Sequence, residues 1–231
     1  MIQTIPAFNL ALSFIPVLLV LVILYRWSLA SRTAIYALAR MLLQLILIGY
    51  VLTYIFDSNH SGFIMLVLTV MLLASSWIAL RPVKDKQRQF YFKALGSIAL
   101  GGITTLVLVT QFVLELQPWF LPQYMVPLAG MIFANSMNAV SLAAERFEAE
   151  TKNNISYETA RRTAMNASMI PLINMLFAVG LVSLPGMMTG QILSGISPLI
   201  AVRYQIMVMC MIFGSAGISA ACYLILLKPD K

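Results

Sequence analysis

Seven long apolar segments follow one another along this chain of 231 residues, and they constrain its fold more than any other feature. A helix needs about 20 mostly apolar residues to cross the hydrocarbon core of a bilayer, which is about 30 Å thick. Charged residues make up 10% of the chain, whereas soluble domains carry about 25%. We therefore predict an all-α integral membrane protein, a polytopic bundle of about seven transmembrane helices, over residues 5–25, 34–56, 62–80, 92–114, 124–144, 169–193 and 204–227.

The whole chain, residues 1–231, is predicted to form a single membrane domain. It holds no Gly-x-x-x-x-Gly-Lys run, the loop that binds nucleotide phosphates, so any use of ATP would need a partner. The first apolar segment has no Lys or Arg before Arg26 and no small-x-small cleavage pattern, so we interpret it as a retained helix. Pro16 inside this segment predicts a kink, because proline removes one helical hydrogen bond.

The basic residues indicate which side of the membrane each loop faces. With the N-terminus outside and the C-terminus inside, every Lys and Arg except Arg203 falls in or near an inner loop, as the positive-inside rule requires. The formal net charge of +7 then reflects topology and contact with anionic membrane lipid, and binding to nucleic acid is not expected. A re-entrant hairpin at 169–193 would instead place Lys228 and Lys231 outside. A complete crossing with a break is favoured, because the segment is long enough to span.

A charged stretch interrupts the apolar pattern between residues 145 and 162, and the predicted insert extends to about residue 169. Residues 153–156 predict a turn between two short helices. Ser156 is a favoured N-cap, and Glu158 lies in the first turn after it, where the helix dipole favours a carboxylate. We interpret the stretch as an amphipathic helix–turn–helix on the cytoplasmic surface. The alternative is a solvated loop whose charges keep it out of the lipid.

Two motifs resemble sequences of ABC-transporter permeases. Glu148-Ala149 begins a stretch similar to the Glu-Ala-Ala…Gly coupling loop of those proteins. This chain differs at two positions of the motif, because Glu150 replaces the second Ala and Asn154 replaces the Gly. After Gly, Asn is the residue that most readily adopts a positive φ, so Asn154 is compatible with the same turn. Residues 179–193, with the sequence VGLVSLPGMMTGQIL, are similar to the signature of the FetB (YbbM) family of ABC permeases. The likeness runs from about residue 40 to residue 206.

The resemblance implies an integral membrane subunit that pairs with a second copy of itself and with a separate, FetA-like ABC ATPase. Mg-ATP would bind to that partner, and this chain would be neither an enzyme nor the holder of a cofactor. Bacterial members of the family are associated with iron export and metal resistance, and plant relatives with aluminium tolerance. The expected location is the bacterial inner membrane. The resemblance assigns contact with the ATPase to Glu148, Ala149, Asn154, Ser156, Arg161 and Arg162.

Polar groups and helix breakers inside apolar segments are candidates for a translocation path or gate, because polar groups are costly in lipid. Each candidate also has a purely structural interpretation. An arginine can extend to the lipid headgroups, amides can hydrogen-bond between helices, and methionine is a common core residue. The Pro-Gly pair at 185–186 is expected to be an unwound turn, which needs protein or water around it at that depth. The candidates are Arg40, Gln44, Asn135, Asn138, Asn174, Pro185, Gly186, Met187, Met188, Arg203 and Gln205.

No cluster of His, Cys and carboxylates has the spacing of a tight metal site, although Asp57 and His60 in an outer loop could meet a metal. A metal cargo would therefore be held weakly, across subunits or as a chelate.

Two functions other than ABC transport stay open. A secondary transporter driven by an ion gradient would need carboxylates within its spans, and none of the 8 acidic residues lies mid-segment. A membrane scaffold without transport would need neither a broken helix nor a turn that binds an ATPase.

Overall fold

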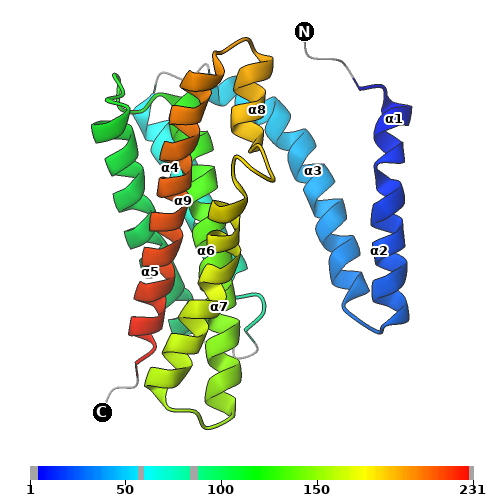
Figure 1. The fold of residues 1–231 in the computed structure, drawn as a ribbon, viewed down its shortest axis with the longest axis vertical. Coiled ribbons are helices and arrows are strands. Elements are labelled where there is room, and N and C mark those ends of the chain that lie inside the picture. The colour runs from blue at the N-terminus through cyan, green and yellow to red at the C-terminus, as the bar shows by residue number, and fades with distance from the viewer. Residues whose placement is uncertain (1–4, 57–59, 84–87, 229–231) are drawn as a thin grey trace. The chain divides into compact units, whose positions relative to one another are not determined.

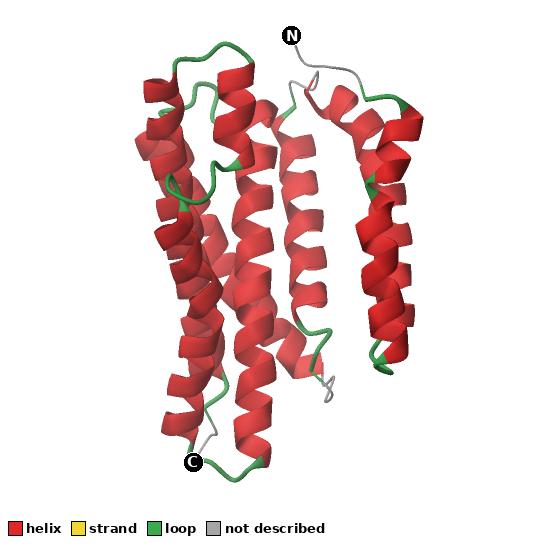
Figure 2. Ribbon diagram, turned by 45° about the vertical axis from the view of Figure 1, so that its right-hand side comes forward, coloured by secondary structure: helices red, strands yellow, loops and turns green. Residues whose placement is uncertain are grey.

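The computed structural model describes residues 5–56, 60–83 and 88–228, and its regular structure is helical throughout (Figures 1 and 2). The predicted all-α class is confirmed, since the described residues form no strand and only one isolated bridge, between Val179 and Ser183. The elements are α1 (Ala7–Leu12), α2 (Phe14–Arg26), α3 (Ser31–Phe56), α4 (Ser61–Ala79), α5 (Arg88–Val107), the π-helix η1 (Leu108–Val113), α6 (Pro122–Lys152), α7 (Tyr157–Ala178), α8 (Gly186–Leu193) and α9 (Pro198–Leu226).

The chain divides into two compact units, Met1–Ser58 and Asn59–Lys231, and each is described by itself. In the first unit, α1 and α2 form one apolar stretch that is interrupted at Ser13. The backbone N–H and the hydroxyl of Ser13 both donate to the Leu10 carbonyl, at 3.1 and 2.6 Å. Pro16 explains the interruption, because it has no N–H to offer the Leu12 carbonyl. The helix is therefore interrupted three residues before Pro16, and the kink itself stays a prediction. The prediction of one domain stays a prediction.

The connection between α2 and α3 is a tight turn in which Ser28 has a φ of 54° and the Leu29 N–H donates to the Leu24 carbonyl at 2.9 Å. No residue of α1 or α2 is buried. Apolar helices whose faces stay uncovered in this way are expected to meet lipid or another protein surface.

The core of the second unit lies where α5, α6 and α9 pack together, and small residues bring these helices close. A Cβ added to Gly101 of α5 would lie 2.8 Å from the Ser215 carbonyl oxygen of α9, and one added to Gly102 would lie 2.7 Å from the Phe133 ring of α6. Small residues serve membrane bundles because lipid offers no hydrophobic driving force between helices. Those buried at these contacts are Ala94, Ser97, Ser136, Ala139, Ala143, Ser215, Ala216, Ser219 and Ala220.

Six stretches of the described residues are helices long and apolar enough to cross a membrane. They are Ala7–Arg26, Ser31–Leu52, Ser61–Ala79, Arg88–Val113, Pro122–Lys152 and Pro198–Leu226. The seventh predicted crossing, residues 169–193, is not one helix, because α7 ends at Ala178 and α8 has only 8 residues. The count of seven spans and the orientation in the membrane therefore stay predictions.

The course of α7 and α8 agrees with a crossing that contains a break. At one end of the second unit, the Tyr157 hydroxyl at the start of α7 donates to the Leu224 carbonyl near the end of α9, at 2.8 Å. At the other end, Met187 and Gln191 of α8 line a cavity together with Tyr124 near the start of α6. Figure 1 shows α7 low in the bundle, α8 high, and α9 returning towards the C-terminus. We call the end that carries the α6–α7 turn and the end of α9 the turn end.

The predicted insert at residues 145–169 is not built of two short helices. Its first arm is the end of α6 and its second arm is the start of α7, both continuous with long helices. The 31 residues of α6 measure about 46 Å at 1.5 Å per residue. This length exceeds a hydrocarbon core of about 30 Å by about 16 Å. A run of good helix formers, Ala143–Ala144–Glu145–Arg146, explains why α6 does not stop at the apolar boundary.

Candidate functional site

The turn between α6 and α7 is closed by its own backbone and by one side-chain cap. The N–H groups of Asn153 and Asn154 donate to the carbonyls of Glu150 and Thr151, both at 3.1 Å. Asn154 has a φ of 56°, the left-handed conformation expected where the resembling coupling loops place Gly. The Thr159 N–H donates to the Ser156 hydroxyl at 3.4 Å, so Ser156 is the N-cap of α7, as predicted.

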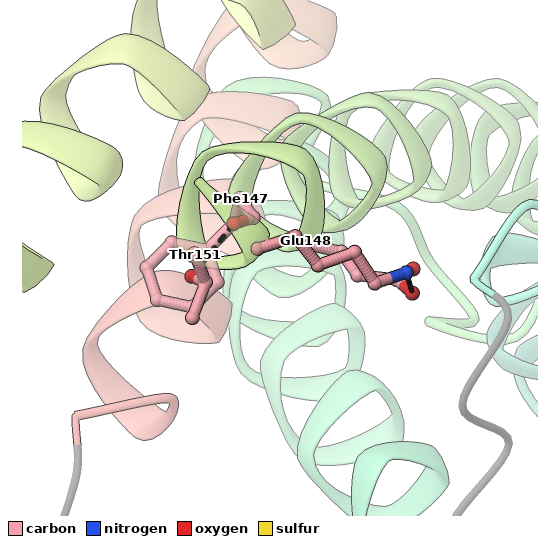
Figure 3. Close-up of polar contacts among 4 residues, drawn as sticks. Phe147, Glu148 and Thr151 are labelled. Carbon is pink, nitrogen blue, oxygen red and sulfur yellow. Dashed lines mark hydrogen bonds and ion pairs between the residues drawn. The ribbon is translucent and has the colours of Figure 1, made fainter. Parts of the chain in front are cut away.

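The last turns of α6 carry two ion pairs along the helix. Arg146 pairs with Glu150 at 2.6 Å, and Lys152 pairs with Glu148, each four residues apart. In Figure 3 the Thr151 hydroxyl bonds back to the Phe147 carbonyl, while the Glu148 side chain extends from the opposite side of the helix. Both glutamates are thus held in fixed directions on one arm of the turn, with the half-exposed Ala149 between them.

The second arm presents its positive charges to the solvent. Arg161 and Arg162 are both exposed, and the Arg161 guanidinium lies 5.5 Å from the centre of the Tyr157 ring. Neither arginine forms an ion pair with a carboxylate in the described part of the chain. One arm therefore carries paired acids and the other carries unpaired bases.

The turn is fastened to the bundle beneath it. The Phe147 and Tyr157 rings meet edge to face, with their centres 5.9 Å apart, and so join the two arms. The Tyr157 hydroxyl bonds to Leu224 of α9. Ala160 and Ala164 of α7 are fully buried. These contacts join the turn to α6, α7 and α9.

The break between α7 and α8 spans residues 179–185 and is wider than the sequence predicts. Proline 185 caps α8, and Gly186 is the first residue of that helix. The chain already leaves the helix at Val179, where Gly180 has a φ of 83° and its N–H donates to the Ser183 carbonyl at 3.0 Å. Leu181 and Val182 at its tip are 90% and 84% exposed. Exposed apolar side chains on a non-helical segment of a membrane protein are expected to meet lipid or another protein surface.

A cavity of about 180 Å³ lies beside α8. Its walls include the thioethers of Met187 and Met207 and the rings of Tyr124 and Tyr204. The side-chain oxygen of Gln191, also in the wall, is buried without a hydrogen-bond partner in the described part of the chain. Met188, on the same helix, is half-buried and is not part of this wall.

The other predicted path residues are not gathered around one polar channel. Asn135 donates one hydrogen bond from its amide back to the Met131 carbonyl within α6, at 2.8 Å. Asn138, Asn174 and Arg203 are exposed. Gln205 is buried on α9, and its side-chain oxygen has no partner among the described atoms.

Arg40 and Gln44 lie on α3 and belong to the first unit. Gln44 is exposed there and Arg40 is half-buried.

The described residues include no group of three or more His, Cys, Asp or Glu side chains that could hold a metal ion. His60 is exposed, and Asp57 lies outside the described residues.

Sequence reasoning missed the π-helix η1, which continues α5. Its Thr110 is buried, and the Gln111 amide donates to the Thr110 hydroxyl at 3.1 Å. Both residues line a cavity of about 400 Å³ between α4, α5 and α6. Single π turns often mark functional positions. The Thr-Gln pair inside an apolar segment was the available signal, since polar groups there are costly.

The chain is similar to proteins from bacteria and plants over most of its length. A family model described as Uncharacterised protein family (UPF0014) matches residues 7–230. The chain is 32% identical over 234 residues to the probable iron export permease protein FetB of Escherichia coli, covering 94% of this chain and 89% of that protein. It is 35% identical over 208 residues to the UPF0014 membrane protein slr1647 of Synechocystis, covering 82% and 80%.

A plant protein is related to a similar degree. The chain is 33% identical over 226 residues to Protein ALUMINUM SENSITIVE 3 of Arabidopsis thaliana, covering 91% of this chain and 81% of that protein. No solved structure matches the chain.

Proposed function

Because the chain belongs to the UPF0014 family and is a multi-pass membrane protein, we propose that it is the membrane-spanning permease of an ABC transporter. Two copies would form the transport path, and a separate FetA-like ABC ATPase would bind at the turn end and supply the energy. The cargo would be iron or another metal, exported across the bacterial inner membrane. The relative named as a probable iron export permease supports this choice of cargo.

The α6–α7 turn carries the proposal. It extends beyond the apolar length of its helices, is capped by Ser156, and turns at Asn154 with the conformation of a coupling-loop glycine. Glu148, Ala149, Asn154, Ser156, Arg161 and Arg162 would form the surface that meets the ATPase.

Movement of the ATPase would reach the transport path through rigid contacts. The Phe147–Tyr157 ring pair and the Tyr157–Leu224 hydrogen bond support this route, because they join both arms of the turn to α9. At its other end α7 stops at the break of residues 179–185. A helix that ends at a non-helical segment can shift without dragging α8 rigidly with it, so Pro185 and Gly186 would act as the gate.

The polar candidates would line the path only when two copies come together. Arg40, Gln44, Asn138, Asn174 and Arg203 are half-buried or exposed in the single chain, which leaves them accessible to a second copy or to cargo. Met187 and the Gln191 carbonyl face one cavity, and they would offer a weak thioether and amide contact rather than a tight metal site.

An exchange of the Glu148–Lys152 ion pair tests the docking surface. The chain would be purified with its candidate ATPase, and complex formation and ATP hydrolysis would be measured for Glu148→Lys and for the double variant Glu148→Lys/Lys152→Glu. The double variant restores an ion pair on the helix but reverses the charges that a partner meets. We expect both variants to lose the complex.

The exchange separates two roles of Glu148. Recovery of the complex in the double variant would show that the pair only stabilises α6, and the assignment of Glu148 to docking would be wrong. Arg161→Glu on the second arm provides an independent reversal, for which we expect the same loss. Full hydrolysis in all three variants would overturn the proposed coupling.

A further inference from the structure

A cavity at the turn end has no part in the proposed transport path. It measures about 490 Å³ and is lined mainly by α5, by the end of α6, and by the end of α9 with the residues after it. Cavities of roughly 300–1,000 Å³ are typical of sites for small molecules. The cavity lies beside the ends of three long helices, and we expect lipid headgroups at such ends in a membrane protein.

Three lysines from separate parts of the chain line this cavity. Lys93 comes from α5, Lys152 from the last turn of α6, and Lys228 from the residues after α9. Lys152 is occupied by its ion pair with Glu148. Lys93 and Lys228 form no ion pair with a carboxylate in the described ranges, although Lys93 lies 5.9 Å from the centre of the Phe90 ring. Two positive charges in the wall are therefore left to attract an anion.

Glu148, the one carboxylate that the described residues place in the wall, does not cancel this attraction. Glu148 is held by Lys152, so the net charge of the three lysines and Glu148 stays positive. Gln89 and Tyr223 add polar groups at the same cavity, and such groups can donate hydrogen bonds to phosphate oxygens.

The rest of the cavity wall is apolar except for Thr151, whose hydroxyl is bonded to the Phe147 carbonyl. Val83, Phe90, Ala144, Phe147 and Leu227 form the apolar part. Free inorganic phosphate gains nothing from such walls, whereas the glycerol and first methylenes of a lipid would be removed from water there. Basic pockets between membrane helices are known to suit acidic headgroups.

We propose that this cavity is a binding site for an anionic phospholipid, with the phosphate held by Lys93 and Lys228 and the proximal acyl carbons against Phe90 and Phe147. The bound lipid would lie directly against the arm of α6 that carries Glu148. The site requires only that the chain is in a membrane, so it stands whether or not an ATPase binds at the turn.

Lipid titration of the purified chain in a non-ionic detergent tests the site. Phosphatidylglycerol, phosphatidylethanolamine and inorganic phosphate would be added separately, and binding would be followed by native mass spectrometry and thermal stability. We expect phosphatidylglycerol to bind and stabilise more than phosphatidylethanolamine. In Lys93→Gln/Lys228→Gln the affinity for phosphatidylglycerol should fall by about fivefold for each lysine removed, and the effect should weaken as salt is raised.

Two control variants separate the effect of the charges in this cavity from a general effect of charge on lipid binding. Arg32→Gln on α3 also removes one positive charge, but Arg32 is not among the residues that line this cavity, so the variant should bind phosphatidylglycerol like the unchanged chain. Lys93→Arg/Lys228→Arg keeps both charges and should retain most of the affinity.

Three results would overturn the proposal. The first is unchanged phosphatidylglycerol binding in the glutamine double variant. The second is equal binding of phosphatidylethanolamine and phosphatidylglycerol. The third is full stabilisation by inorganic phosphate at the same phosphate concentration, which would assign the site to a soluble anion.

Discussion

The hydroxyl of Tyr157 donates a hydrogen bond of 2.8 Å to the backbone carbonyl of Leu224, across 67 positions of sequence. The bond joins the first residue of α7 to the last turns of α9, where C-terminal carbonyls have no partner within their own helix. The ring of Tyr157 also meets Phe147 at the end of α6. One side chain thus connects three helices at the place where the proposed ATPase would bind.

Tyr157→Phe should weaken this connection without emptying the space that the ring fills. A typical hydrogen bond within a protein contributes about 1 kcal/mol, so we expect a loss of that size in the free energy of unfolding. Coupling should suffer more than stability, because the carbonyl of Leu224 would no longer follow α7. Chemical unfolding in detergent and ATP hydrolysis by the complex measure the two effects.

A matched control for this substitution is Tyr25→Phe. Tyr25 is 76% exposed on α2, so loss of its hydroxyl should change neither quantity. Equal behaviour of the two variants would contradict a special role for the Tyr157–Leu224 bond.

The positive φ of Asn154 predicts an unusual order of substitutions in the turn. Asn154→Gly should keep the turn and the complex with the ATPase, because glycine adopts this conformation freely. Asn154→Val should distort the turn, since a left-handed conformation costs an ordinary residue about 1–2 kcal/mol. Co-purification with the ATPase checks both variants.

The neighbouring Asn153 provides the control for that pair. It has the same side chain but a φ of −88°, so Asn153→Val carries no left-handed strain. If Asn153→Val and Asn154→Val lost the complex equally, loss of an amide rather than backbone geometry would explain the result.

Local features at the turn were predictable from the sequence because they depend on neighbouring residues. The cap at Ser156, the turn at Asn153–Asn154 and the buried side of α7 follow from side chains within a few positions of one another. The apolar runs likewise identify a membrane protein without any knowledge of packing. The sequence predicts a short helix after the apolar segment, but α6 continues without interruption to Lys152. The point where a segment stops being apolar does not mark the point where its helix ends.

Long-range and irregular features could not be predicted in this way. Nothing near Tyr157 indicates that its partner is a backbone carbonyl 67 positions away. The break before α8 begins at Val179 rather than at Pro185, since Gly180 and the bridge to Ser183 close a separate turn. The cavity with Lys93, Lys152 and Lys228 unites residues from three elements, and single-sequence spacing carries no signal of it.

Close packing between α5 and α9 makes Gly101 sensitive to added volume. In Gly101→Ala the new Cβ would lie 2.8 Å from the Ser215 carbonyl oxygen and 2.9 Å from the Ser219 nitrogen, both backbone atoms that cannot turn away. Overpacking of this kind costs about 1–3 kcal/mol, and we expect that loss in unfolding measurements. Gly96→Ala on the same helix meets nothing within 4 Å, so it should be neutral or stabilising. Equal stability of both variants would contradict the close approach.

The course of α7, α8 and α9 predicts which positions share a side of the membrane. With Cys210 and Cys222 replaced by alanine, single cysteines at Asn153→Cys and Lys228→Cys should react with a membrane-impermeant maleimide only after the cells are opened. Ser197→Cys, before α9, should react in intact cells. Labelling of Lys228→Cys but not Asn153→Cys from outside would contradict a crossing with a break. Labelling of both from outside would reverse the orientation.

Strain at Gly180 makes the break between α7 and α8 testable. Its φ of 83° is rarely adopted by residues with a Cβ, so Gly180→Ala should destabilise the closed turn by about 1–2 kcal/mol. The Cβ itself meets nothing within 4 Å, and the effect would therefore come from the backbone alone. Gly190→Ala is the matched control, because Gly190 lies in α8 with equally open space around it. If the break acts as a gate, cells with Gly180→Ala should retain more iron than cells with Gly190→Ala, at equal amounts of membrane-inserted protein. Equal iron content in the two strains, with the turn destabilised as expected, would show that the geometry of the break does not govern export.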